Sequence, residues 1–153
     1  MLLLSRPAIL GIRSMSFSFI EGLPVYNICV IMVSMLEWTV EYYKDAKGSE
    51  PVAEFIDSLP IGAQAKIFRL IGLLARYHVL LKEPYTKQIK GKVRELRIVD
   101  AIGKIRVLCF GYTDKRFVLL HGFVKKEAKT PKREIEIAEK RIQDYMQRHG
   151  GAA

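Results

Sequence analysis

Two arginines and a lysine cluster in the C-terminal half of the chain have the types and spacing needed to bind a phosphate group. Arg97 and Arg106 lie on two apolar segments joined by a short turn, and Lys125 and Lys126 follow a third such segment. Planar guanidinium groups bind phosphate oxygens in a bidentate manner, and a lysine close to other cations can have a lowered pKa. These four residues are therefore candidate catalytic groups of a site that cleaves a phosphodiester.

Cleavage of RNA without a metal ion sets three tasks for such a site. The 2′-hydroxyl group must lose its proton, the phosphorane must be stabilised, and the leaving 5′-oxygen must gain a proton. The arginines suit the second task, and a lysine with a lowered pKa could act as the base. His121 and Tyr112 are further catalytic candidates. For His121, at the end of an apolar segment, a packed structural role is favoured; Tyr112 could equally stack a base or close a hairpin.

A second set of cations flanks these candidates and is expected to bind RNA. We expect Arg94 and Arg97 to share one face of their strand. We also expect Arg97 and Arg106 to converge, because facing side chains of adjacent strands lie within about 5 Å. The alternative is a set of exposed cations without a common target. The RNA-binding set consists of Lys87, Lys90, Lys92, Arg94 and Lys129.

The positive charge of the chain is concentrated in its C-terminal half. Of the formal net charge of +9 over 153 residues, residues 1–34 contribute +1, residues 35–81 contribute −1 and residues 82–153 contribute +9. This asymmetry favours a nucleic acid as partner over an acidic protein, an anionic membrane or a merely basic surface. Half of the residues are hydrophobic, which excludes a disordered chain and allows one domain with one sizeable core.

Cysteine and histidine spacing indicates neither a metal site nor a disulfide framework. Cys29 and Cys109 are far apart in the sequence, and the three histidines are isolated. Cys109 lies in an apolar strand pattern and is expected to be a buried small hydrophobe. We therefore expect no metal, no cofactor and a location in the reducing cytoplasm. The absence of a glycine-rich phosphate loop and of a Gly-x-Ser-x-Gly motif disfavours hydrolases built on those parts.

The first 34 residues differ in character from the rest. They are apolar without a sustained period, and their longest uncharged run, from Gly22 to Leu36, has 15 residues. A membrane span needs about 20 apolar residues, so no membrane association is expected. We interpret residues 1–34 as an extension that is translated upstream sequence, with Met35 as the physiological start. A weak anchor or signal segment is the alternative.

The pattern after Met35 predicts a single α+β domain over residues 35–149, followed by a disordered tail at 150–153. Its order is β-α-α-β-β-β-α, and residues 81–91 are expected to form a basic loop without regular structure. Ser49 and Thr130 are expected to cap helices whose first turns contain a proline. A small antiparallel sheet would carry an N-terminal helical hairpin on one face and leave the other face partly open. The expected elements are strands at 36–43, 93–99, 104–112 and 116–122, and helices at 50–59, 61–78 and from 131 onward.

Three segments together resemble RelE/HigB-type toxins of type II toxin–antitoxin systems, in particular their phage-derived, HigB-like branch of the RelE/ParE superfamily. The segments are Val93-Arg-Glu-Leu-Arg97, Gly103-Lys-Ile-Arg106 with its strand, and Leu120-His-Gly-Phe-Val-Lys-Lys126 with Thr130-Pro131. The resemblance spans about residues 36–145. It implies a RelE-like, microbial-ribonuclease-like fold. It also implies a bacterial or prophage toxin that inhibits translation by cutting messenger RNA on the ribosome, as an mRNA interferase. The implied partners are the ribosome, mRNA and a cognate antitoxin, typically a helix-turn-helix DNA-binding protein.

The resemblance also implies roles for particular residues. Arg106 corresponds to the arginine that contacts the scissile phosphate, and Lys125 or Lys126 to the basic residue after the last strand. Val93 and Glu95 stand where some relatives have a lysine pair, and no tyrosine lies at the start of the last helix. The general acid and base therefore remain open. The alternative functions are a ParE-like poison of DNA gyrase, which uses the same fold, and a non-catalytic RNA-binding regulator.

Overall fold

The computed structural model describes residues 37–150. The predictions for residues 1–34, for a start at Met35 and for the tail at 151–153 lie outside this part of the chain. The described elements, in chain order, are β1 (Thr39–Tyr42), α3 (Pro51–Asp57), α4 (Ile61–Tyr77), the 3-10 turn η4 (His78–Leu80), β2 (Thr86–Lys90), β3 (Val93–Asp100), β4 (Gly103–Tyr112), β5 (Arg116–Lys125) and α5 (Lys132–His149).

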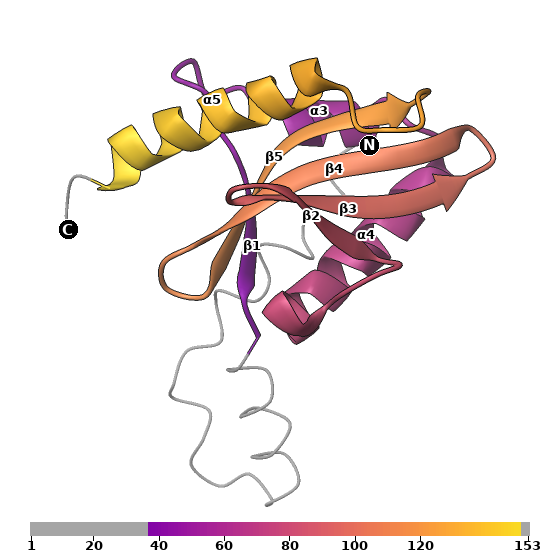
Figure 1. Ribbon diagram of the computed structural model, residues 1–153, viewed down its shortest axis with the longest axis horizontal. Helices are drawn as coiled ribbons and strands as arrows, with labels where there is room; N and C mark the ends of the chain where they lie inside the picture. Colours follow the sequence, from indigo (N-terminus) through magenta and orange to yellow (C-terminus); the bar gives the residue numbers. More distant parts are fainter. Residues whose placement is uncertain (1–36, 151–153) are drawn as a thin grey trace, which may run out of the picture.

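The five strands form one sheet in the order β1-β5-β4-β3-β2 (Figure 1). Neighbouring strands are antiparallel except β1 and β5, which are parallel, with Thr39 opposite Arg116. The α+β class is therefore confirmed, with a sheet that is mostly rather than wholly antiparallel. The helical hairpin between β1 and β2 and the helix after β5 also agree with the expected RelE-like arrangement.

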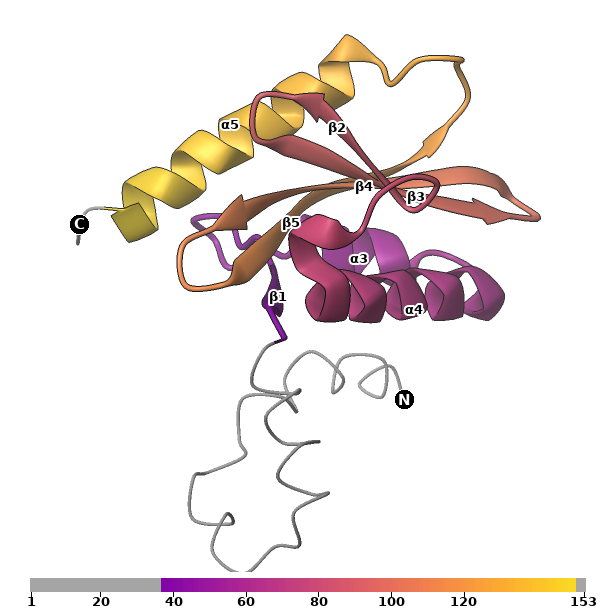
Figure 2. The same cartoon turned by 60° about the horizontal axis from the view of Figure 1, so that its bottom comes forward.

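Helices cover both faces of the sheet (Figure 2). The alternation along the central strand β4 sends Ile105, Val107 and Cys109 into the core beneath α3 and α4, and sends Leu108 and Phe110 into the core beneath α5. Cys109 is fully buried as predicted, and burial raises the pKa of its thiol to about 12. The second face, expected to be partly open, is covered by α5 along part of its length.

The segment expected to be a basic loop contains an edge strand. Residues Thr86–Lys90 form β2, which pairs antiparallel with β3 and contains a register shift between Gln88 and Lys90. Its five residues include one large aliphatic side chain, Ile89, so the sequence offers no alternation by which to recognise a strand. The loop prediction is wrong because pairing with β3, and not local pattern, forms this strand.

The predicted helix caps are also wrong. The residue before α5 is Pro131, and the Thr130 hydroxyl group donates a hydrogen bond to the buried carboxylate of Glu95 instead of to the helix. The Ser49 hydroxyl group likewise donates to Glu54 Oε1, at 2.6 Å, and makes no capping bond. In both cases a nearby carboxylate is a stronger acceptor for the hydroxyl group.

A close approach between α3 and β5 requires a glycine. A Cβ atom on Gly122 would lie 2.3 Å from Phe55 Cδ1 and 2.8 Å from Cε1 of the same ring. The phenyl ring of α3 therefore rests directly on the backbone of β5, and this contact sets the distance between helix and sheet.

Candidate phosphate-binding pocket

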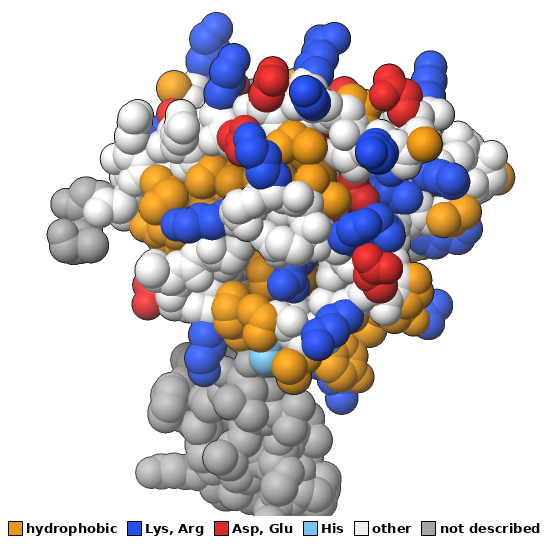
Figure 3. Space-filling model, viewed as in Figure 1, with side chains coloured by type: hydrophobic (Ala, Val, Ile, Leu, Met, Phe, Trp, Pro, Cys, Tyr) orange, Lys and Arg blue, Asp and Glu red, His pale blue; other side chains and the backbone are white. Residues whose placement is uncertain are grey.

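A pocket of about 340 Å³ lies between β2, β3, the end of β5 and the loop that leads to α5. Its lining contains four cationic side chains and no carboxylate, which favours an anionic ligand. The face drawn in Figure 3 shows Lys and Arg side chains gathered around smaller hydrophobic areas. The lining residues are Lys87, Gln88, Ile89, Arg97, Lys125, Ala128, Lys129 and Thr130.

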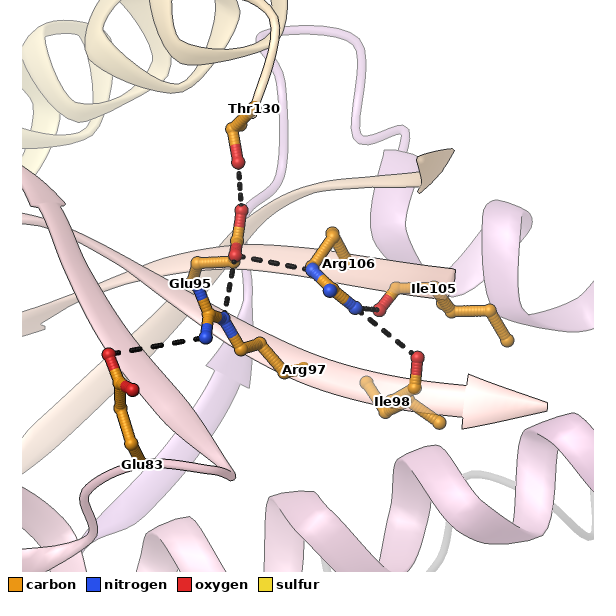
Figure 4. Close-up of polar contacts among 7 residues, drawn as sticks. All are labelled: Glu83, Glu95, Arg97, Ile98, Ile105, Arg106 and Thr130. Carbon is orange, nitrogen blue, oxygen red and sulfur yellow. Dashed lines mark hydrogen bonds and ion pairs between the residues drawn. The ribbon is translucent and has the colours of Figure 1, made fainter. Parts of the chain in front are cut away.

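A buried carboxylate contacts two of the residues that line this pocket, Arg97 and Thr130 (Figure 4). Glu95 on β3 is fully buried, and its Oε1 lies 3.1 Å from Arg97 Nε and 3.2 Å from Arg106 Nε. Its other oxygen accepts the hydrogen bond from Thr130, in the loop before α5. The β3–β4 register places Arg97 directly opposite Arg106, so the two arginines converge on one face as predicted. Glu95 therefore connects both arginines to the loop that forms the pocket wall.

The two arginines differ in their access to a ligand. Arg97 lines the pocket, and its side chain is 25% exposed. Arg106 is only 7% exposed, and its Nη1 donates to the backbone oxygens of Ile98 and Ile105, at 3.3 and 2.8 Å. Its Nε faces Glu95 as an ion pair without hydrogen-bond geometry. Burial lowers the pKa of Arg106, and the charge of Glu95 partly opposes this effect. Arg106 lies beneath the pocket, where it supports Glu95.

Lys125 reaches the pocket from the end of β5. Partial desolvation lowers the pKa of its ammonium group; nearby Glu95 raises it, and the charges of Arg106, Arg97 and Lys104 lower it further. The net direction is downward, so Lys125 gives up a proton more readily than an isolated lysine. A lowered pKa is the direction of change that makes a lysine a better proton donor.

His121 is held away from the pocket by α5. Its Nε2 is paired with Glu134, and its Nδ1 lies 3.3 Å from Arg141 Nη1. Burial lowers the pKa of His121, while Glu134 raises it. Its ring also stacks on Phe123, with centroids 5.7 Å apart. These contacts agree with the packed structural role that the sequence favoured.

The other predicted residues divide between the pocket and other surfaces. Lys87 and Lys129 line the pocket, whereas Lys90 pairs with Glu139 on α5 at 2.8 Å. Lys92 and Lys126 are exposed and do not line the pocket. Tyr112 lies at the far end of β4, packed edge-on against Phe110 and Tyr145.

Arg94 lies on the opposite face of the sheet from the pocket. Its guanidinium group sits 6.0 Å from the ring centroid of Phe117 and donates to His78 O at 3.4 Å. The prediction that Arg94 and Arg97 share a face is wrong, because residues three apart along a strand point to opposite faces.

Sequence reasoning missed Glu95 and Thr130 as parts of this site. The sequence predicts that an acid in a basic segment, such as Glu95, is exposed to solvent. It predicts Thr130 as a helix cap. The sequence does contain a signal. Val93, Glu95 and Arg97 are two residues apart along β3, so the carboxylate and the guanidinium group must point to the same face of the sheet. Gln88 and Ile89 were missed together with β2.

Comparison with known proteins places this chain in a family. The model of the Gp49-like phage-derived proteins matches residues 54–143, which include most of α3, the pocket and most of α5. No curated protein matches the chain. Within residues 37–150, no helix is long and apolar enough to cross a membrane. Because the family match covers more than half of the chain, the protein belongs to the phage-derived Gp49-like family (DUF891), a toxin-like family related to the RelE-type toxins.

Proposed function

We propose that the protein is the toxin of a type II toxin–antitoxin system, of the HigB-like branch, and that it cuts messenger RNA on the ribosome. The observation that carries this proposal is the pocket itself, where Arg97, Lys125, Lys87 and Lys129 surround a space above a buried Glu95. Membership of a phage-derived, toxin-like family supports the same conclusion. Phosphate is the anion that such a set of cations suits best.

The proposed chemistry uses Arg97 and Lys125 in different roles. The 2′-hydroxyl group gives its proton to solvent water as its oxygen attacks the adjacent phosphorus, and Arg97 stabilises the negative charge of the phosphorane. The bond from phosphorus to the 5′-oxygen then breaks, and Lys125 donates a proton to that oxygen. Arg106 and Glu95 position Arg97 from below. This assignment moves the phosphate contact from Arg106, which the resemblance suggested, to the arginine that reaches the pocket.

The proposed partners follow from the proposed activity. A toxin that cuts translated RNA acts in the cytoplasm and meets both the ribosome and mRNA there. A cognate antitoxin, of the helix-turn-helix DNA-binding type, would hold it inactive. The pocket face would be covered in that complex, because a free phosphate site would leave the toxin active.

The test is to map mRNA 5′ ends after a short pulse of the protein started at Met35. We expect new cuts within translated regions, and a cleavage rate reduced about 10²–10³-fold by Arg97→Ala. Lys125→Ala should reduce it about 10²–10⁴-fold. Arg69→Ala removes an exposed arginine from α4, on the other side of the sheet, and should leave the cuts unchanged.

Three outcomes would contradict the proposal. Arrested growth with intact transcripts and a DNA-damage response would indicate a gyrase poison. Harmless overproduction would indicate an RNA-binding regulator. Cuts that persist in a folded Arg97→Ala variant would remove the pocket from the mechanism.

A further inference from the structure

A tyrosine outside the predicted site stands beside the pocket arginine. Tyr85 directly precedes β2, and Arg97 donates its backbone N–H to Tyr85 O at 2.8 Å. Since Thr86 pairs with Leu96, Tyr85 is the cross-strand neighbour of Arg97. Facing side chains of such neighbours lie within about 5 Å of each other.

Tyr85 lies one residue before β2, and extending the alternation of that strand back by one residue puts its side chain on the face of the pocket. Thr86 points to the opposite side, where it is 3% exposed and its hydroxyl group donates to Leu81 O at 2.7 Å. Lys87, the next residue, lines the pocket. Tyr85 and Lys87 therefore flank Thr86 and share the pocket face.

The Tyr85 ring is presented to solvent by a fixed backbone. The residue is 48% exposed, and no described residue forms a hydrogen bond with its hydroxyl group or stacks an aromatic ring or a cation on its ring. A turn holds its backbone, because the N–H groups of Tyr85 and Thr86 both donate to Lys82 O, at 3.0 and 3.2 Å. A half-exposed aromatic ring on a fixed backbone beside a cationic pocket is a surface on which a nucleobase can stack.

Besides the buried Glu95, an exposed acid, Glu83, faces this region. Glu83 Oε1 lies 4.0 Å from Arg97 Nη1, and the Glu83 side chain is 62% exposed (Figure 4). An ion pair this exposed and this long contributes little. A phosphate ligand can therefore replace Glu83 as the partner of Arg97.

We propose that Tyr85 forms a base-stacking subsite of the pocket. Its ring would stack on the base of the nucleotide whose phosphate is bound by Arg97. This inference rests on the proposed function, since it takes RNA as the ligand. Every base has a flat π face, so the subsite would bind single-stranded RNA with little sequence preference. Ile89 and Ala128 add apolar side chains to the lining of the pocket.

Binding of a short, labelled 2′-O-methyl RNA tests the subsite by fluorescence anisotropy, because this RNA lacks the nucleophile and is not cut. We expect Tyr85→Ala to weaken binding about 5- to 140-fold, which corresponds to about 1–3 kcal/mol at 1.4 kcal/mol per tenfold. Tyr85→Phe keeps the ring and should bind within about twofold of the wild type. Tyr77→Ala is the matched control, since Tyr77 is 45% exposed but belongs to α4.

A series of RNAs with one abasic position each separates stacking from general RNA binding. In the wild type, one abasic position should weaken binding much more than the others. In Tyr85→Ala, that position should have no further effect, because the stacking partner is already missing. RNA binding that Tyr85→Ala leaves unchanged, or equal losses at every abasic position, would overturn the subsite alone. If the wild type binds no RNA, the subsite falls, and the mapping of mRNA 5′ ends decides the proposed function separately.

Discussion

Replacing Glu95 by glutamine removes one negative charge from between two arginines and leaves the side-chain volume nearly unchanged. Arg97 keeps access to water, but the Arg106 side chain, at 8% exposure, is left as a buried charge without a counter-ion. Breaking a buried pair in this way costs about 3–5 kcal/mol of unfolding free energy. Glutamine retains an oxygen that accepts from Thr130, so Glu95→Ala should cost about 1 kcal/mol more.

Thermal and urea denaturation followed by circular dichroism measure this effect. For a domain of this size, each kcal/mol lowers the melting temperature by about 3–6 °C, so we expect Glu95→Gln to melt about 10–25 °C below the wild type. The matched control is Glu139→Gln, which removes the exposed carboxylate paired with Lys90. That surface pair should contribute no more than about 1 kcal/mol.

A second substitution distinguishes charge from packing. If the loss comes from the uncompensated charge, adding Arg106→Met to Glu95→Gln should restore part of the stability, because the buried charge is then gone. A Glu95→Gln protein as stable as Glu139→Gln would refute the idea that Glu95 neutralises the arginines. A loss that Arg106→Met only deepens would assign the effect to packing.

Two further predictions concern other contacts of the fold. Gly122→Ala should lower the unfolding free energy by about 1–3 kcal/mol, because the new Cβ would overlap the ring of Phe55. Gly72→Ala, at an open position in the middle of α4, should instead raise it by about 0.4–1 kcal/mol; equal effects of the two in urea denaturation would disprove the close approach. The second prediction concerns pH. Because the pKa of His121 is lower in the folded protein, the unfolded chain binds a proton at this residue more readily. The contribution of His121 to the unfolding free energy is therefore complete above its unfolded pKa of about 6.5, and it falls as the pH drops towards the folded pKa. His121→Gln should lose less stability than the wild type between pH 7.5 and 5.5, and a parallel decline of both proteins would show that Glu134 cancels the desolvation.

The sequence predicts most of the helices and strands because their patterns are local. Strong apolar alternation marks β3, β4 and β5, and a 3.6-residue period marks α4 and α5. Local patterns do not predict the strand β2, since its formation depends on hydrogen bonds to the edge of β3. They do not predict the parallel pairing of β1 with β5 for the same reason, because that choice depends on the assembled sheet and not on either strand alone.

The site likewise has features that the sequence predicts and features that depend on the assembled structure. Cation type and spacing predict Arg97, Lys125, Lys87 and Lys129 at the pocket. The same reasoning does not predict the burial of Arg106, because this burial depends on the counter-ion that Glu95 supplies, and no sequence pattern marks a buried ion pair. The convergence of Arg97 and Arg106 across the hairpin is predicted, whereas their unequal access to a ligand depends on the loop that Thr130 attaches to Glu95.

The parallel pairing of the first described strand, β1, with the last one, β5, determines when the sheet can be completed during synthesis of the chain. Thr39 pairs with Arg116, so the chain between them must be made before β1 has a partner. Contacts between residues this distant in sequence form late and slow folding, since loop closure must come first. The pocket depends on the same late segment, because Lys125, Lys129 and Thr130 follow it. A nascent chain therefore completes its sheet edge and its cationic pocket together, only after residues 116–130 have been made.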